Sequence, residues 1–196
     1  MTDFRQFDRP IRELNFAVWQ LARDMARQNI PYARRAFGLP ELQARRLAEL
    51  ENRELLALAD DPQPHWEIHH PRQLDALLDV IKPMGEPAEP NHFRAEIKEL
   101  NLSLWHLARD MARTDPDIAR RVFGLKPNHC QRLAQLNLKE LRALADDMRP
   151  TWQIHLPKSM DLLIGHVIAK RSEDRMRLVR LSVMSSRIPA LSLEDL

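Results

Sequence analysis

The chain contains an internal repeat. Residues 12–78 align without a gap with residues 98–164 at a constant offset of 86, and 35 of the 67 aligned positions are identical. Two unrelated segments that share only a helical pattern would not agree so closely. Positions that the copies share are interpreted as scaffold, and positions where they differ as places of separate function. The repeat predicts a dimer fused into a single chain.

The repeat divides the chain into four expected regions. We expect a first repeat over residues 1–82, a linker over 83–92, a second repeat over 93–164, and a basic amphipathic helix with a tail over 165–196. The linker is predicted because its sequence, PMGEPAEPNH, contains three prolines and a glycine, a composition typical of a semi-rigid spacer. Two small units joined in this way fit a chain of 196 residues.

Each repeat is predicted to be all-α. Strand signals are scarce, and the apolar residues recur at helical spacing. The opening segment of each copy places its apolar residues on one face of a helix of about 15 to 18 residues; these residues are Leu14, Val18, Leu21 and Met25 in the first copy and Leu100, Leu104, Leu107 and Met111 in the second. The charged residues that follow in both copies are expected to point to water; they are Arg23, Asp24, Arg109 and Asp110.

The second copy gives the bounds of its shorter helices. Asp115 can cap a helix that begins with Pro116 and ends at Gly124. A third helix is expected over 127–135, and a capping box at Asn137 opens a fourth through residue 145. The TWQIH stretch after Pro150 can be extended, and a fifth helix is expected to begin at Pro157.

Composition restricts the function classes only mildly. The net charge is +2 and the sequence pI is near 8.9, so a nucleic-acid surface would have to come from local clustering. Cys130 is the single cysteine, which excludes an intramolecular disulfide and suits a reducing compartment. Its counterpart in the first copy is Ala44, so the shared fold does not need a thiol. No stretch reaches the ~20 apolar residues of a membrane span, and the opening MTDFRQFDRP is unlike a signal peptide. We therefore expect a cytoplasmic protein.

The sequence contains no catalytic motif that we recognise. Glycine-rich phosphate loops, nucleophile elbows and paired CxxC motifs are missing from it. His65, His69 and His70 could suggest a metal site, but only His69 has a histidine counterpart, His155. Hydrogen-bonded surface histidines are the preferred interpretation. The chain is accordingly predicted to be no enzyme and to hold no metal or cofactor.

Four tryptophans occupy equivalent places in the two copies, Trp19 with Trp105 and Trp66 with Trp152. Because tryptophan buries a large apolar area, repeated tryptophans are interpreted as core or pseudo-dimer interface rather than as ligand platforms. The same assignment is made for the apolar face of the second opening helix, formed by Leu104, Leu107 and Met111.

Arginine pairs provide the candidate DNA contacts. Arg34 and Arg35, and their counterparts Arg120 and Arg121, precede the Phe–Gly turn of each copy. They form either a solvated helix face or a contact to a phosphate backbone, since helix–turn–helix-like units offer arginines in this way. The basic segment 165–187 supplies further candidates, Arg171 and Arg175 for DNA and Arg177, Val179, Arg180 and Val183 for partner docking.

The second copy combines opening LNLS and LAR segments, an aspartate before the short helix, a turn glycine and a spaced leucine–alanine pattern; these are residues 100–103, 107–109, Asp115, Gly124, Leu133, Ala134, Leu136, Leu138, Leu144 and Ala145. In these residues the copy resembles the FlhD family, the small subunit of the bacterial flagellar master transcriptional activator. The resemblance covers about 65 residues of each repeat.

The resemblance implies a helical, dimer-forming subunit that joins a zinc-binding FlhC-like protein, binds promoter DNA in that complex and recruits RNA polymerase. Zinc is then expected only in the partner. Family members are homodimers of single units, whereas this chain carries two. The family's inter-subunit cysteine falls at Trp66 and Trp152, so no disulfide-linked dimer is implied. Similar activators control transfer genes of mobile elements as well as flagella. The alternative is a protein-interaction regulator, such as an anti-activator, that never contacts DNA.

Overall fold

The structure, a computed structural model, describes residues 4–61, 63–68, 78, 92–146 and 151–154. It is mostly helical with one small sheet, which confirms the all-α prediction except for two short strands. The first repeat contains η1 (Phe4–Phe7), α1 (Asp8–Gln28), α2 (Ile30–Phe37), α3 (Glu41–Ala48), α4 (Asn52–Ala59) and β1 (Trp66–Ile68). The second contains α6 (Arg94–Thr114), α7 (Pro116–Phe123), α8 (Pro127–Gln135), α9 (Leu138–Ala145) and β2 (Trp152–Ile154).

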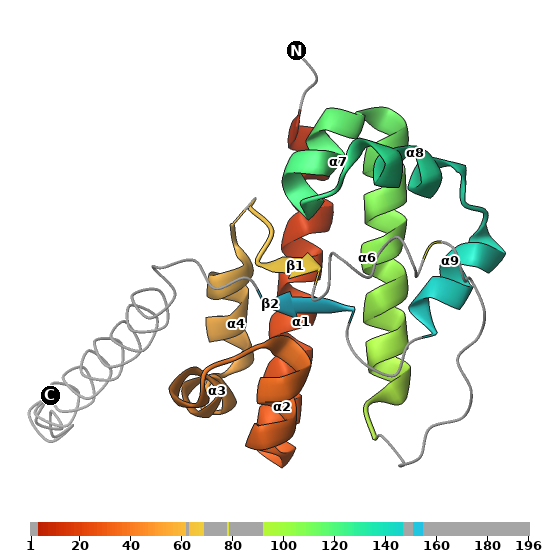
Figure 1. The fold of residues 1–196 in the computed structure, drawn as a ribbon. Coiled ribbons are helices and arrows are strands. Elements are labelled where there is room, and N and C mark those ends of the chain that lie inside the picture. Colours follow the sequence, from red (N-terminus) through yellow and green to blue (C-terminus); the bar gives the residue numbers. More distant parts are fainter. Residues whose placement is uncertain (1–3, 62, 69–77, 79–91, 147–150, 155–196) are drawn as a thin grey trace, which may run out of the picture.

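The two long helices form the centre of the molecule. α1 and α6 pack against each other and run in opposite directions, so that α2 and α7 lie at opposite ends (Figure 1). Both long helices have 21 residues, longer than the 15 to 18 expected. The fully buried Ile11 and Ile97 in the first turn of each helix extend the apolar face.

Local capping explains where the short helices begin and end. Asn29 accepts a hydrogen bond from the amide of Tyr32 at 2.9 Å, and Asp115 caps α7 in the same way. Both helices end at a glycine in the left-handed conformation, Gly38 with φ 69° and Gly124 with φ 63°. The predicted bounds of α7, α8 and α9 are confirmed.

A two-stranded antiparallel sheet joins the repeats. Trp66 pairs with Ile154, Glu67 with Gln153, and Ile68 with Trp152. Glu67 and Gln153 are equivalent residues of the two copies, so a pseudo-twofold axis passes between them. The apolar side chains of both repeats form one continuous core around this axis. The described residues therefore form a pseudo-dimer within one chain.

The expectation for the charged residues of the opening helices was partly wrong. The side chain of Arg23 is buried, and it donates to Asp24 at 2.9 Å and to Asn52 Oδ1 at 2.6 Å. Its counterpart Arg109 is half-buried. Because the α1–α4 contact covers the stem of Arg23, the helical pattern alone could not show its burial.

Candidate functional site

The four tryptophans lie in the core, at the junction of the repeats. The ring centroids of Trp66 and Trp152 are 5.8 Å apart in an edge-to-face arrangement. Trp152 also contacts Trp105 at 4.8 Å and Phe123 at 5.5 Å, while Trp66 lies 5.0 Å from Phe123. These distances are in the range at which aromatic pairs add to the energy of area burial. Leu104, Leu107 and Met111 of α6 are buried in the same core.

A buried asparagine in each copy holds the strand to the long helix. Asn15 donates from Nδ2 to the carbonyls of Asp61 at 3.1 Å and Gln63 at 2.8 Å, and its Oδ1 accepts from the amide of His65 at 2.9 Å. Asn101 accepts from the amide of Thr151 at 2.9 Å in the same way. No role was predicted for this pair of asparagines. Their repetition on the apolar face of both opening helices could have indicated one, because a buried asparagine needs polar partners.

A second repeated clamp involves arginine. Arg27 donates to the carbonyls of Ala48 and Leu50, both at 2.8 Å, and Arg113 donates to those of Ala134 at 2.6 Å and Leu136 at 3.2 Å. These carbonyls end α3 and α8, where no helical amide can reach them. The two arginines fix the short helical hairpins onto the long helices.

His65 of the first copy is buried. The prediction that it is a surface histidine was therefore wrong. Trp19 donates from Nε1 to His65 Nδ1 at 3.0 Å, and His65 Nε2 lies 3.4 Å from Asp61 Oδ2. Since an indole N–H can only donate, His65 Nδ1 must be the acceptor and Nε2 carries the proton. The second copy has Thr151 in this place, and Trp105 Nε1 is buried without a partner among the described residues. His69 and His70 lie outside the described residues.

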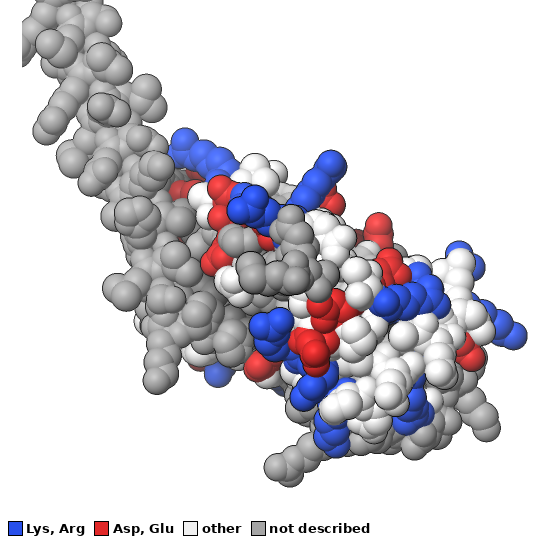
Figure 2. All heavy atoms as spheres, turned by 90° about the horizontal axis from the view of Figure 1, so that it is seen from above, with Lys and Arg blue, Asp and Glu red and all other residues white. Residues whose placement is uncertain are grey.

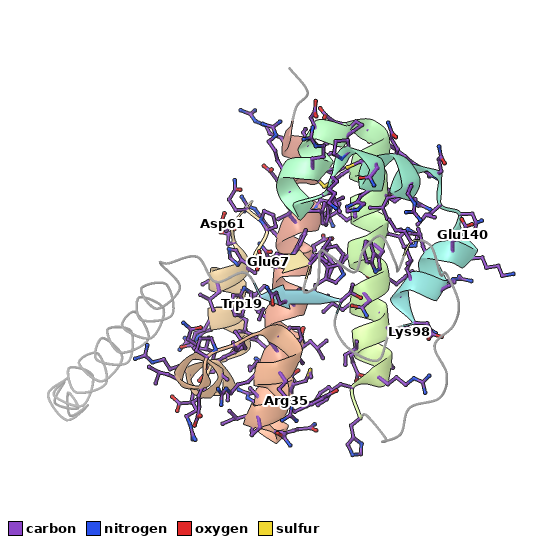
Figure 3. The ribbon with its side chains drawn as sticks, viewed as in Figure 1. Trp19, Arg35, Asp61, Glu67, Lys98 and Glu140 are labelled. Carbon is purple, nitrogen blue, oxygen red and sulfur yellow. The ribbon has the colours of Figure 1, made fainter. Side chains whose placement is uncertain are left out.

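The structure does not bring the two arginine pairs together. Arg35 is exposed at the α2 end of the molecule, as Figure 3 shows, and Arg121 is exposed on α7 at the other end. Arg34 Nη1 donates to Glu41 Oε2 at 3.0 Å, and Arg120 Nη1 donates to Asp117 Oδ1 at 3.1 Å. Each repeat thus presents one arginine in an ion pair beside a second arginine exposed to solvent.

Charges are mixed on the face that Figure 2 shows, which is the end carrying α7. Acidic and basic side chains alternate there instead of forming a single basic patch. The candidate residues of the basic C-terminal segment lie outside the described residues; they are Arg171, Arg175, Arg177, Val179, Arg180 and Val183. Their assignment remains a prediction.

Cys130 has the character of a core residue. Its side chain is buried, its Sγ lies 3.7 Å from the carbonyl oxygen of Pro116, and burial raises the pKa of the thiol. Nearby Arg120 opposes that shift and Asp117 adds to it. A protonated buried thiol is a poor nucleophile and a poor metal ligand. Among the residues that the structure describes, no three histidines, cysteines or acidic residues are placed to hold a metal ion.

The fold and these contacts define a helical pseudo-dimer whose buried polar groups hold its parts together. The sequence profile of the family described as flagellar transcriptional activator (FlhD) matches residues 84–189, more than half of the chain. The chain belongs to the FlhD family. The family is one of transcriptional regulators, not of enzymes.

The match covers the second repeat and extends beyond it into the basic segment. The match does not include the first repeat, whose relation to the second is the identity of 35 of 67 aligned residues. No curated protein and no solved structure matches the chain at a significant level. Within the described residues, no helix has both the length and the apolar character that crossing a bilayer requires.

Proposed function

We propose that this chain is a subunit of a DNA-binding transcriptional activator complex, in which it works in the cytoplasm with an FlhC-like protein and recruits RNA polymerase. The family match over residues 84–189 is the observation that carries the proposal. FlhD-like subunits pair as homodimers, and the packing of α1 on α6 supplies such a pair within one chain. Covalent linkage raises the effective concentration of the two halves without any added contact.

The placement of the arginines supports a contact to DNA. The two pairs lie at opposite ends of antiparallel helices of 21 residues. A helix of that length measures about 31 Å, close to the ~34 Å of one turn of B-DNA. Arginines at opposite ends of helices of this length suit one phosphate contact at each end of the molecule. The genes switched on would be flagellar genes or the transfer genes of a mobile element.

Co-expression with the FlhC-like product of a neighbouring gene tests the proposal. The complex should bind the upstream region of its target operon, and neutralising four arginines to glutamine should reduce the salt dependence of that binding; these are Arg34, Arg35, Arg120 and Arg121. Unchanged regulation by the neutralised chain in cells would favour the alternative, a protein-interaction regulator that mimics one subunit. Tight, specific promoter binding by the chain alone would contradict the need for a partner.

A further inference from the structure

The first repeat has a charged pocket beside its arginine pair. The pocket has a volume of about 480 Å³ and lies where the end of α1, the beginning of α2 and the beginning of α3 meet. Three arginines and one glutamate line it, Arg27, Arg34, Arg45 and Glu41. Arg27 is held by the carbonyls of Ala48 and Leu50, so its guanidinium is fixed in place.

The carboxylate of Glu41 lies between two of these arginines, Arg34 and Arg45. It accepts from Arg45 at 2.8 Å and 3.2 Å and from Arg34 at 3.0 Å. The hydrogen bond and charge of Arg45, and then the charge of Arg34, lower the pKa of Glu41, so it stays ionised at neutral pH. The Nε of Arg34 is buried and has no hydrogen-bond partner among the described residues. The pocket thus holds an oxyanion that its own chain provides, bound by two of its arginines.

The equivalent positions of the second repeat have a different charge. Arg113 and Arg120 replace Arg27 and Arg34, but Gln131 stands in place of Arg45 and Pro127 in place of Glu41. Two carboxylates are added there, since Asp115 and Asp117 replace Asn29 and Pro31. Asp117 is the ion-pair partner of Arg120, and Asp115 caps α7. The positions of the second repeat therefore carry two guanidiniums and two carboxylates. Those of the first repeat carry three guanidiniums and one carboxylate.

We propose that the pocket of the first repeat binds a backbone phosphate of DNA and that the equivalent place in the second repeat does not, so that the contact at that end comes from exposed Arg121 alone. This rests on the proposed function and adds that the two ends of the pseudo-dimer contact DNA unequally. The phosphate would displace Glu41 and bind Arg34 and Arg45, in the forked geometry that guanidinium groups make with oxyanions. A homodimer has two identical ends, whereas a pair with two different ends can orient itself on DNA in this way.

An extended polyanion fits this end better than a single carboxylate of a protein partner. Residues 27–48 contain five arginines, and Glu41 is the one acidic residue among them. The corresponding residues 113–134 have as many basic residues, but both of their aspartates stand at pocket positions. Exposed Arg35 lies next to the pocket in sequence and can contact the following phosphate.

The test compares matched variants of the two ends in the complex with the FlhC-like protein. Binding to a fluorescently labelled duplex of the target promoter is titrated between about 50 and 200 mM salt. Arg34→Gln with Arg45→Gln should weaken binding about tenfold and reduce the salt slope by about 1. The second repeat already has Gln131, so its matched comparison is between Arg120→Gln and Arg34→Gln alone, each of which removes one guanidinium. Arg34→Gln should weaken binding by more than about threefold, and Arg120→Gln should change affinity less than about twofold.

A variant of opposite sign separates binding from a structural role. Glu41→Gln removes the competing carboxylate and should tighten DNA binding and steepen the salt slope, which the loss of a merely structural ion pair would not do. Thermal unfolding of each variant checks that the pocket residues have not altered the fold.

Three results would overturn the proposal. Equal losses at the two ends would contradict the asymmetry while leaving DNA binding by the complex in place. Weaker assembly of the complex, with an unchanged salt slope for the complex that still forms, would assign the pocket to an acidic segment of the protein partner. A complex that binds no promoter DNA would overturn both this inference and the proposed function.

Discussion

Gln153 donates a hydrogen bond from Nε2 to Oε1 of Glu67 at 2.6 Å, across the pseudo-twofold axis between the repeats. The two residues are equivalent in sequence, so a symmetric dimer would place two identical side chains here. A carboxylate facing an amide makes a charge-assisted hydrogen bond, whereas two carboxylates would repel. The sequence difference at this position therefore favours pairing of the first repeat with the second.

Gln153→Glu tests this relationship. The variant places two carboxylates in contact and should lower the free energy of unfolding by about 1–3 kcal/mol at neutral pH. Exchange of both residues, Glu67→Gln with Gln153→Glu, restores the pair and should recover most of the stability. Full stability of the single variant at neutral pH in urea unfolding would contradict this prediction.

The tryptophan partners differ between the repeats and can be exchanged. His65→Thr leaves Trp19 Nε1 without an acceptor and should destabilise the chain by about 1–3 kcal/mol. Thr151→His offers an acceptor to Trp105 Nε1, which has no partner among the described residues. This variant should raise the free energy of unfolding of the chain by about 0.5–1.5 kcal/mol. Chemical denaturation followed by tryptophan fluorescence measures both changes. A destabilised Thr151→His variant would show that the second repeat has no room for the imidazole.

The two turn glycines offer a matched comparison. Both have positive φ, so alanine is strained at either position by about 1 kcal/mol. A Cβ at Gly38 would lie 3.1 Å from Gln153 Oε1, whereas one at Gly124 has no heavy atom within 4 Å. We expect Gly38→Ala to cost more than Gly124→Ala, because Gln153 must move. Equal midpoints in parallel urea titrations would contradict this.

The ionisation of Glu41 makes the stability of the folded chain depend on pH. Arg45 and Arg34 lower the pKa of Glu41 in the folded chain, so its contribution to stability is complete above the ordinary glutamate pKa, about 4.3. That contribution is lost as the pH falls through the lower folded value. NMR titration of the Glu41 carboxyl should give a midpoint below the ordinary one, and Arg45→Gln should move it upward. A midpoint that Arg45→Gln leaves unchanged would show that the ion pair does not form in solution.

Local signals in the sequence predicted the helices well. Asp115, Pro116 and Gly124 act within one turn of the chain, and their capping chemistry sets the bounds of α7 without help from the rest of the fold. The strand at Trp152–Ile154 follows from Pro150 in the sequence and a short β-branched and aromatic run.

The contacts between distant segments could not be predicted in this way. The register of β1 on β2 depends on residues 86 positions apart, and the burial of Arg23 depends on where α4 docks. The pocket of the first repeat likewise needs the placement of α3 beside α2, which brings Glu41 to Arg34. Periodicity reports which face of a helix is apolar and says nothing of which element covers it.

The pairing of β1 with β2 also has a consequence during synthesis. β1 is complete once Ile68 has been added, but its partner strand ends at Ile154. At a ribosomal rate of about 5–20 residues per second, the nascent first repeat waits on the order of ten seconds with an unpaired strand edge and without the Phe123 and Trp152 rings that Trp66 contacts in the full chain. An edge of that kind invites pairing with a neighbouring nascent chain on the same messenger RNA. Because both repeats are in one chain, neither has to find the other after release from the ribosome. Instead the edge of β1 is exposed during synthesis, and a chaperone would have its main opportunity to act in that period.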